Sequence, residues 1–271
     1  MNPFKQLLQT TGAAMPVGTW IMSASPLVAE AMGHAGFDWG VIDMEHTPLD
    51  LMDLVHMLQA VSGTPLLPVV RVPWNDTVNI KRVLDAGATT LLVPFVQNAE
   101  EARAAVAATR YPPEGRRGMA GMSRASKFGT TPQYLTTANA QMTVILQLET
   151  TEAIAQLEAI AAVPGVDALF IGPGDLSATM GHVGQLTHPE VLAVTADAVA
   201  RAQALGMPFG TVVGTTEVVA QYRAIGFDFI AIASDLGLLM RSAQAALASV
   251  RNTGAAPTTP TTSTTPTNGG Y

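Results

Sequence analysis

The chain has 271 residues, of which 48% are hydrophobic and 13% are charged, and this low charged fraction predicts a large buried core. Its formal net charge of −7 and the lack of any Lys- or Arg-rich run argue against a nucleic-acid partner. The absence of cysteine excludes disulfide bonds, thiolate catalysis and cysteine-ligated zinc. No apolar run has the length of a membrane span and the N-terminus lacks a signal-peptide core, so we expect a soluble, cytoplasmic protein that binds no membrane.

Eight apolar segments recur along the chain, and each ends in polar or glycine-rich residues. Several are apolar without interruption, which is typical of strands covered on both faces in a parallel sheet. They occupy residues 17–22, 39–43, 66–72, 90–96, 142–149, 168–172, 208–213 and 227–233.

A helical pattern follows each apolar segment, and glycine recurs in the turns that lead back to the next strand, where a helix C-cap favours a left-handed residue. The eight strand-then-helix units predict an α/β fold, a single (β/α)8 TIM barrel over residues 1–252, with an open doubly wound sheet as the alternative. The helical patterns occupy residues 26–35, 50–61, 75–86, 98–110, 150–163, 189–205, 215–225 and 235–251.

Two segments interrupt this repeat. Residues 110–141 form a long connection after the fourth unit, and connections of this length are usually functional or carry small elements of their own. Residues 253–271 are rich in Thr and Pro and cannot build a core, so we expect them to form a disordered tail.

Polar and charged side chains gather where the predicted strands end. In a barrel these ends meet at one rim, and TIM-barrel enzymes carry their active sites there. Acids, a His and an Arg at one rim predict a functional site. The rim residues are Trp20, Asp43, Glu45, His46, Arg71, Gln147, Glu149, Gly172, Gly174, Asp175, Val213, Ser234 and Asp235.

The charged members of this rim allow two interpretations each. Glu149 and Asp175 follow adjacent strands and could together ligate a divalent cation, although Asp175 also suits the N-cap of a helix. Arg71 suits a fixed counter-charge for a carboxylate or an enolate oxygen, or else a structural salt bridge. His46 suits a general base oriented by Asp43, or a residue that is merely hydrogen-bonded.

The remaining candidates are less specific. Trp20 suits an apolar wall of the pocket or core packing. His182 and His188 flank the loop after Asp175 and are candidates for a substrate contact.

Five motifs are specific in combination: AGFDWGVIDMEH, VVRVPWND, IKRVLDAGATTLLVPFVQNAEEARAAVAATRYPPEGRRG, LQLET and GVDALFIGPGDLSATMGHVG. With them the chain resembles the HpcH/HpaI aldolase family of class II pyruvate-dependent aldolases, from about Gly18 to Asp235. The resemblance implies a TIM barrel of the phosphoenolpyruvate/pyruvate-domain type. It also implies a homohexamer whose last helices exchange between neighbouring subunits.

The resemblance further implies an activity, the reversible cleavage of a 4-hydroxy-2-oxo acid to pyruvate and an aldehyde. The substrate would be 4-hydroxy-2-oxoheptanedioate, from aromatic catabolism, or a 2-keto-3-deoxy sugar acid. Oxaloacetate decarboxylation and cleavage of a CoA thioester are alternatives on the same scaffold, and a non-catalytic binding protein is a third.

The same resemblance assigns roles to individual residues. Glu149 and Asp175 would ligate Mg²⁺, Mn²⁺ or Co²⁺, which pyruvate chelates. The resemblance also implies that Arg71 stabilises the enolate and that His46 with Asp43 transfers protons. The amides of Gly174 and Asp175 would hold the carboxylate, and Gln147 would lie in the same pocket. From their places near strand ends, Trp20 and Val213 are further candidates for substrate contact. Relatives have Gly at the position of Met44, so we expect Met44 to bear on the choice of aldehyde.

Overall fold

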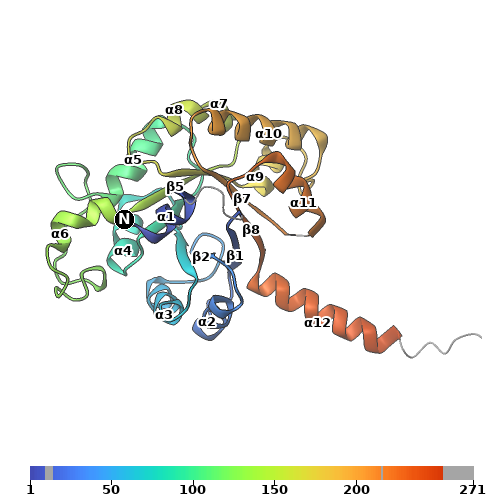
Figure 1. Ribbon diagram of the computed structural model, residues 1–271, viewed down its shortest axis with the longest axis horizontal. Helices are drawn as coiled ribbons and strands as arrows, with labels where there is room; N and C mark the ends of the chain where they lie inside the picture. Colours follow the sequence, from blue (N-terminus) through green and yellow to red (C-terminus); the bar gives the residue numbers. More distant parts are fainter. Residues whose placement is uncertain (10–14, 215, 253–271) are drawn as a thin grey trace, which may run out of the picture. The chain divides into compact units, whose positions relative to one another are not determined.

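The computed structural model describes residues 1–9, 15–214 and 216–252. Eight parallel strands pair in sequence order and close into a barrel, since β1 also pairs with β8 (Figure 1). This confirms the predicted (β/α)8 barrel and excludes the open sheet. The strands are β1 (Val17–Ile21), β2 (Trp39–Asp43), β3 (Leu67–Arg71), β4 (Thr90–Val93), β5 (Thr143–Leu148), β6 (Ala168–Ile171), β7 (Phe209–Val213) and β8 (Phe229–Ser234).

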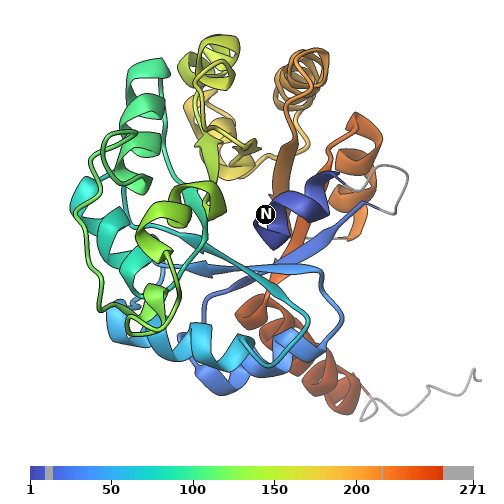
Figure 2. The same cartoon turned by 60° about the vertical axis from the view of Figure 1, so that its left-hand side comes forward.

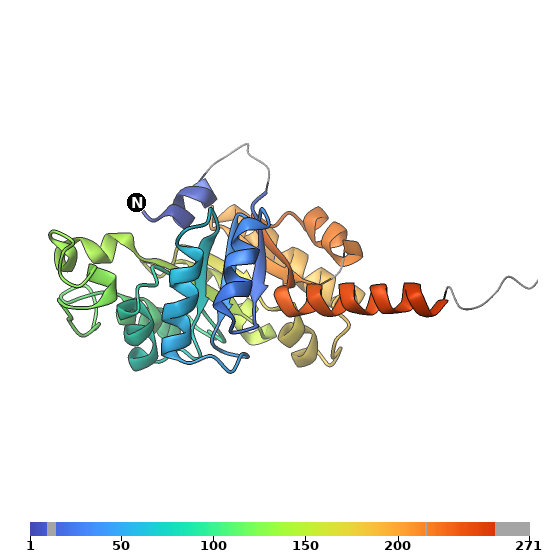
Figure 3. The same ribbon diagram turned by 90° about the horizontal axis from the view of Figure 1, so that it is seen from below.

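Helices surround the strands of the compact unit Met1–Gly237, and Figure 2 shows them as an outer ring. Neighbouring helices pack together, as α2 and α3 do side by side in Figure 3. The helices of this unit are α1 (Pro3–Gln9), α2 (Pro26–His34), α3 (Leu51–Val61), α4 (Thr77–Asp85), α5 (Ala99–Thr109), α6 (Tyr134–Thr137), α7 (Thr151–Ala155), α8 (Leu157–Ala161), α9 (Pro173–Thr179), α10 (Pro189–Ala204) and α11 (Thr216–Ile225).

The last helix, α12 (Asp235–Asn252), continues into a second unit that begins at Leu238. The domain boundary at residue 252 stays a prediction, and the predicted tail 253–271 lies outside the described residues. In the described part of the chain, no helix is both long and apolar enough to cross a membrane.

Local sequence explains where the helices begin. The Asp50 side chain caps α3 by accepting from the backbone N–H groups of Met52 and Asp53. The Asp53 side chain in turn accepts from the backbone N–H of Asp50. The side chains of Asp76 and Asn98 likewise each accept from two backbone N–H groups, in the first turns of α4 and α5. These caps satisfy backbone donors that the first helical turn leaves unpaired.

Two segments differ from the prediction and a third agrees with it. The predicted helix over residues 150–163 is divided into α7 and α8 at Gln156. Residues 110–141 contain short elements, as expected, namely η1 (Arg124–Ser126), α6 and η2 (Ala138–Gln141). This connection runs from the end of α5 to the start of β5, so it lies at the N-terminal end of the barrel, opposite the predicted rim. Helix α1 was not predicted at all.

Helix α1 closes that N-terminal end with one aromatic side chain. Phe4 is 1% exposed and makes edge-to-face contacts with Trp39 and Phe229, with ring centroids 5.7 Å apart in both cases. Space for these rings comes from Gly18 and Gly210, because a Cβ at either position would lie within 2.3 Å of Trp39 or Phe229 atoms. The rings belong to an apolar cluster inside the barrel.

Phe4→Ala should lower the free energy of unfolding by about 3–5 kcal/mol, since it removes a buried aromatic ring and leaves a cavity. Urea unfolding measures this change. Gln9→Ala, an exposed position on the same helix, is the matched control and should change the value by less than about 0.5 kcal/mol. Equal losses in the two variants would show that α1 does not close the barrel.

Candidate active site

The ends of β2 and β3 form a buried ion pair. Asp43 and Arg71 are register partners in the sheet, and they form two parallel hydrogen bonds. Arg71 Nε donates to Asp43 Oδ1 at 2.8 Å and Arg71 Nη2 donates to Oδ2 at 2.7 Å. The Arg71 side chain is 8% exposed and the Asp43 side chain is 0% exposed. This bidentate contact fixes the plane of the guanidinium group.

Glu45 extends the ion pair toward the rim. Its Oε2 lies 3.0 Å from Arg71 Nη1, and its Oε1 lies 3.7 Å from His46 Nε2. Burial raises the pKa of Glu45, and the charge of Arg71 opposes that increase. Burial would lower the pKa of Arg71, but Asp43 and Glu45 raise it above its ordinary value, so the guanidinium stays charged.

His46 is placed differently from the prediction. Asp43 Oδ1 accepts from the backbone N–H groups of Glu45 at 3.0 Å and His46 at 3.5 Å, so Asp43 shapes the turn after β2. The His46 ring faces Glu45 rather than Asp43, and its side chain is 60% exposed. The ring is therefore not oriented by Asp43, which is committed to Arg71.

Glu149 lies buried just after β5, with both carboxylate oxygens bonded. Gln147 Nε2 donates to Oε1 and the Phe95 backbone N–H donates to Oε2, each at 2.8 Å. Phe95 adopts a left-handed backbone (φ 54°), which turns its N–H toward the carboxylate. Gly172 makes room for the pair, because a Cβ there would lie 2.6 Å from Glu149 Oε1 and 2.8 Å from Gln147 Nε2.

Asp175 lies in the first turn of α9, which begins after Gly172. The N-cap is Gly172 rather than Asp175, and no side chain caps the helix. Gly174 and Asp175 are exposed, and their N–H groups belong to the turn that lacks intrahelical partners. The helix-cap interpretation of Asp175 is therefore wrong in its register, and the carboxylate is free to serve the pocket.

Negative charge exceeds positive charge at this rim. Burial, together with the nearby carboxylates of Glu45 and Asp175, raises the pKa of Glu149 to about 8 against the opposing effects of the Phe95 N–H and Arg71. Gln147 Oε1 is a buried acceptor without a hydrogen-bond partner within the described residues, and Glu45 Oε2 has only its ion pair with Arg71. A divalent cation would relieve both features, so the oxygen-rich residue set fits a hard metal ion.

Other predicted rim residues take different positions. Trp20 is 5% exposed and packs against Phe170, with Arg71 Cζ 5.3 Å from its ring centroid, so it lies beneath the guanidinium. The Val213 side chain belongs to the apolar layer outside the barrel, whereas Val212 packs against the interior cluster. The prediction that Val213 lines the pocket therefore does not hold for its side chain.

Met44 also points away from the barrel interior. It belongs to the outer apolar layer and lines a cavity of about 440 Å³ beside Leu49 and Pro73. Asp235 is a structural residue, because its carboxylate accepts from the N–H groups of Met22 at 2.9 Å and Ser23 at 3.1 Å.

Sequence reasoning gave too little weight to three residues of this site. Glu45 was assigned only a supporting role, although its charge inside the Asp-x-Glu-His motif was a usable signal. Phe95 binds Glu149 with its backbone N–H, and its left-handed φ aims that group. The type of its side chain predicts neither feature. Gly172 serves through its missing side chain, and only a glycine at a strand end hints at that.

Known proteins resemble this chain over most of its length. The HpcH/HpaI aldolase/citrate lyase family matches residues 17–242. A 2-dehydro-3,6-dideoxy-6-sulfogluconate aldolase of Pseudomonas putida is 53% identical, over 87% of this chain and 92% of that protein. A pyruvate aldolase of Rhizobium etli is 46% identical, over 90% and 96%.

A solved structure is similar as well. An HpcH/HpaI aldolase/citrate lyase family protein from Burkholderia cenocepacia superposes with a TM-score of 0.89 at 43% identity. The match covers 93% of this chain and all of that one.

The raised pKa of Glu149 makes the stability of the metal-free protein depend on pH. Because the folded pKa of about 8 exceeds the ordinary 4.5, the stabilisation is complete below pH 4.5 and is lost as pH rises through 8. Relative to Glu149→Gln, the wild type in EDTA should lose at most about 5 kcal/mol of unfolding free energy across that range. Urea unfolding at pH 5, 6.5 and 8 measures the difference, and parallel pH profiles would contradict it.

Proposed function

The chain belongs to the HpcH/HpaI aldolase/citrate lyase family, and its named relatives are aldolases, which are carbon–carbon lyases. From this premise we propose that it is a divalent-metal-dependent aldolase. It reversibly cleaves a 4-hydroxy-2-oxo sugar acid to pyruvate and an aldehyde. The observation that carries the proposal is the buried Arg71, locked by Asp43 and placed among the carboxylates of Glu45 and Glu149.

Glu149 and Asp175 are the residues that would hold Mg²⁺, Mn²⁺ or Co²⁺. When bound, the ion supplies a Lewis acid for the 2-oxo group and stabilises charge that develops on its oxygen. Gln147 and the Phe95 N–H hold the Glu149 carboxylate in place. A cation bound there would favour the ionised carboxylate and so lower the raised pKa of Glu149.

Arg71 would stabilise the enolate oxygen. Asp43 uses two of the five guanidinium N–H groups and Glu45 Oε2 lies 3.0 Å from Nη1, which still leaves donors for a substrate oxygen. Trp20 supports the guanidinium from below. Because Asp43 holds Arg71 rather than the His46 ring, its part is to position the arginine, and the group that carries an oxyanion is fixed before the substrate arrives.

Proton transfer would fall to His46 and Glu45. In the cleavage direction a base removes the proton of the C4 hydroxyl, the C3–C4 bond breaks, and its electron pair moves into the pyruvate enolate as the aldehyde leaves. A proton returned to C3 completes the pyruvate methyl group. His46 lies at the solvent edge beside Glu45, so it can exchange protons with water.

The substrate carboxylate would bind the backbone N–H groups of Gly174 and Asp175. The Pseudomonas relative is named for a keto-deoxy sugar acid and the Rhizobium relative for pyruvate, which supports a sugar acid that releases pyruvate. 4-Hydroxy-2-oxoheptanedioate stays a second candidate substrate. The homohexamer and the cytoplasmic location stay predictions.

Treatment with EDTA should abolish pyruvate release from 2-keto-3-deoxy sugar acids, and added Mg²⁺, Mn²⁺ or Co²⁺ should restore it. Glu149→Ala should stay inactive at every metal concentration while it keeps the circular dichroism spectrum of the wild type. A coupled pyruvate assay makes both measurements. 4-Hydroxy-2-oxoheptanedioate and oxaloacetate are assayed separately as alternative substrates. Full activity in a rigorously metal-free sample would refute the proposal.

Arg71→Lys should lower kcat by roughly 100-fold or more, since a lysine is a point charge that cannot make the paired bonds to Asp43 or present a fixed donor. KM should change less than kcat. Arg116→Lys, an exposed arginine in the distant connection, is the matched control. Wild-type turnover in Arg71→Lys would rule out the enolate role.

A further inference from the structure

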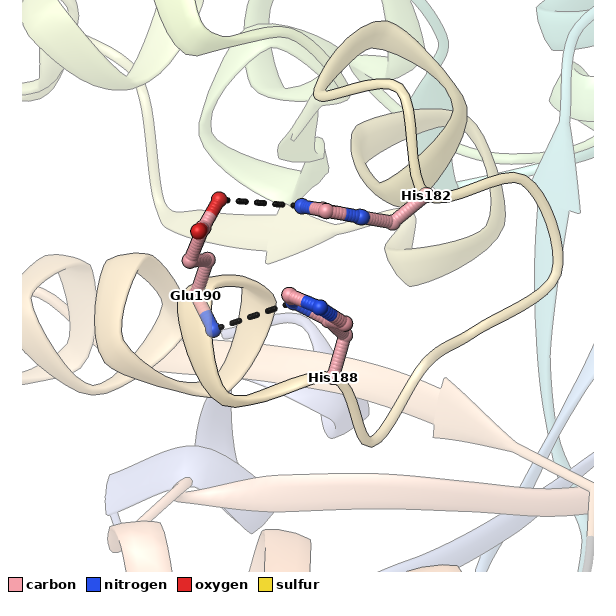
Figure 4. Close-up of side chains that lie close together, drawn as sticks. All are labelled: His182, His188 and Glu190. Carbon is pink, nitrogen blue, oxygen red and sulfur yellow. Dashed lines mark hydrogen bonds and ion pairs between the residues drawn. The ribbon is translucent and has the colours of Figure 1, made fainter.

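Two imidazole rings and a carboxylate meet in the connection between α9 and α10, apart from the rim site. His182 Nε2 lies 2.9 Å from Glu190 Oε2, and the rings of His182 and His188 stack with centroids 3.6 Å apart (Figure 4). One ligand atom from each of the three residues lies within 4.8 Å of the others. No other group of three such side chains meets this spacing in the part of the chain that the structure describes.

Backbone hydrogen bonds hold the segment that presents these side chains. His182 N–H donates to Ser177 O at 2.7 Å, and His188 N–H donates to Gln185 O at 2.9 Å. The Tyr222 hydroxyl donates to Leu186 O at 3.0 Å and ties the middle of the loop to α11. These hydrogen bonds hold the two imidazoles near each other, so an ion would not have to order the loop on binding.

We propose that His182, His188 and Glu190 form a binding site for one transition-metal ion of the Zn²⁺ class, distinct from the proposed Glu149 and Asp175 site. Two imidazoles and a carboxylate are a ligand set that zinc accepts in tetrahedral sites, with water in the fourth position. Bond lengths of about 2.0–2.2 Å place tetrahedral ligand atoms about 3.3 Å apart. The 2.9 Å contact between His182 and Glu190 would open slightly, and the His188 ring, now stacked on His182 at 18°, would rotate to aim a nitrogen at the same ion.

Glu190 supplies the one carboxylate of the group, and its Oε2 already lies 2.9 Å from His182 Nε2. A metal would replace the proton between His182 Nε2 and Glu190. His188 Nδ1 currently accepts from the Glu190 N–H at 3.3 Å as the cap of α10. Coordination through either nitrogen of His188 ends that exposed bond, which water can replace.

Ion binding would link the segment after α9 to the first turn of α10. That segment follows the helix that carries Gly174 and Asp175, so the ion would restrain one border of the proposed active site. The proposal does not depend on the aldolase reaction, because it rests only on the three side chains and their loop.

Calorimetric titration of tag-free protein with Zn²⁺, in the presence of saturating Mg²⁺, tests the proposal. The background is Glu149→Gln, which removes the proposed rim ligand. We expect one Zn²⁺ per chain in this background. Replacement of a direct ligand should weaken Zn²⁺ affinity by at least about tenfold. Even mutation of a residue that only hydrogen-bonds to a metal ligand typically lowers metal affinity by about 10–100-fold.

His188→Asn is the most informative variant, because asparagine is a favoured N-cap and should keep α10 intact while removing one ligand. His182→Gln keeps an amide donor for Glu190. His56→Asn, an exposed histidine on α3, is the matched control and should leave Zn²⁺ binding unchanged. With Co²⁺ as a probe, the visible absorption of a tetrahedral site should appear in the control and disappear in both ligand variants.

Absence of Zn²⁺ binding in the Glu149→Gln protein would overturn the proposal, as would equal affinity in His188→Asn and His56→Asn. Either result leaves the aldolase proposal intact, because pyruvate release is measured separately. Conversely, an inactive enzyme that still binds one Zn²⁺ through His182 and His188 would leave this site standing.

Discussion

The paired register of β2 and β3 is the constraint on which the rim depends. It sets Asp43 beside Arg71 as neighbours across the sheet, and the bidentate contact follows from that register. A slip of either strand by one residue would turn its charged side chain to the opposite face of the sheet and leave that charge buried in the apolar layer around the barrel. The strand register that builds the barrel therefore also sets the geometry of the site.

The second determinant of the site is an uneven balance of charge. Arg71 can satisfy Asp43 and part of Glu45, but Glu149 and Asp175 remain in excess. Folding holds these carboxylates near one another against their repulsion, and the fixed backbone around Phe95 and Gly172 keeps them there. A bound cation would remove this repulsion, so the fold favours cation binding at the site.

Much of the fold was legible in the sequence, and the reasons are physical. Continuous apolar runs and regular glycine turns predicted eight strands, and the strand ends predicted a rim with Asp43, Arg71, Glu149 and Asp175. Side-chain direction was harder, because strand ends are uncertain by one residue and each such shift reverses the facing, as at Val213. Helix α1 escaped notice because its role depends on one buried ring rather than on periodicity.

The aromatic plug formed by Phe4, Trp39 and Phe229 gives the barrel a closed end. The proposed substrate would therefore enter, and its products would leave, at the rim. With pyruvate held deeper, against Arg71 and Glu149, the proposed cleavage would release the aldehyde first and pyruvate last, and synthesis would begin with pyruvate. A barrel closed at one end would in this way impose a kinetic order on a reversible reaction.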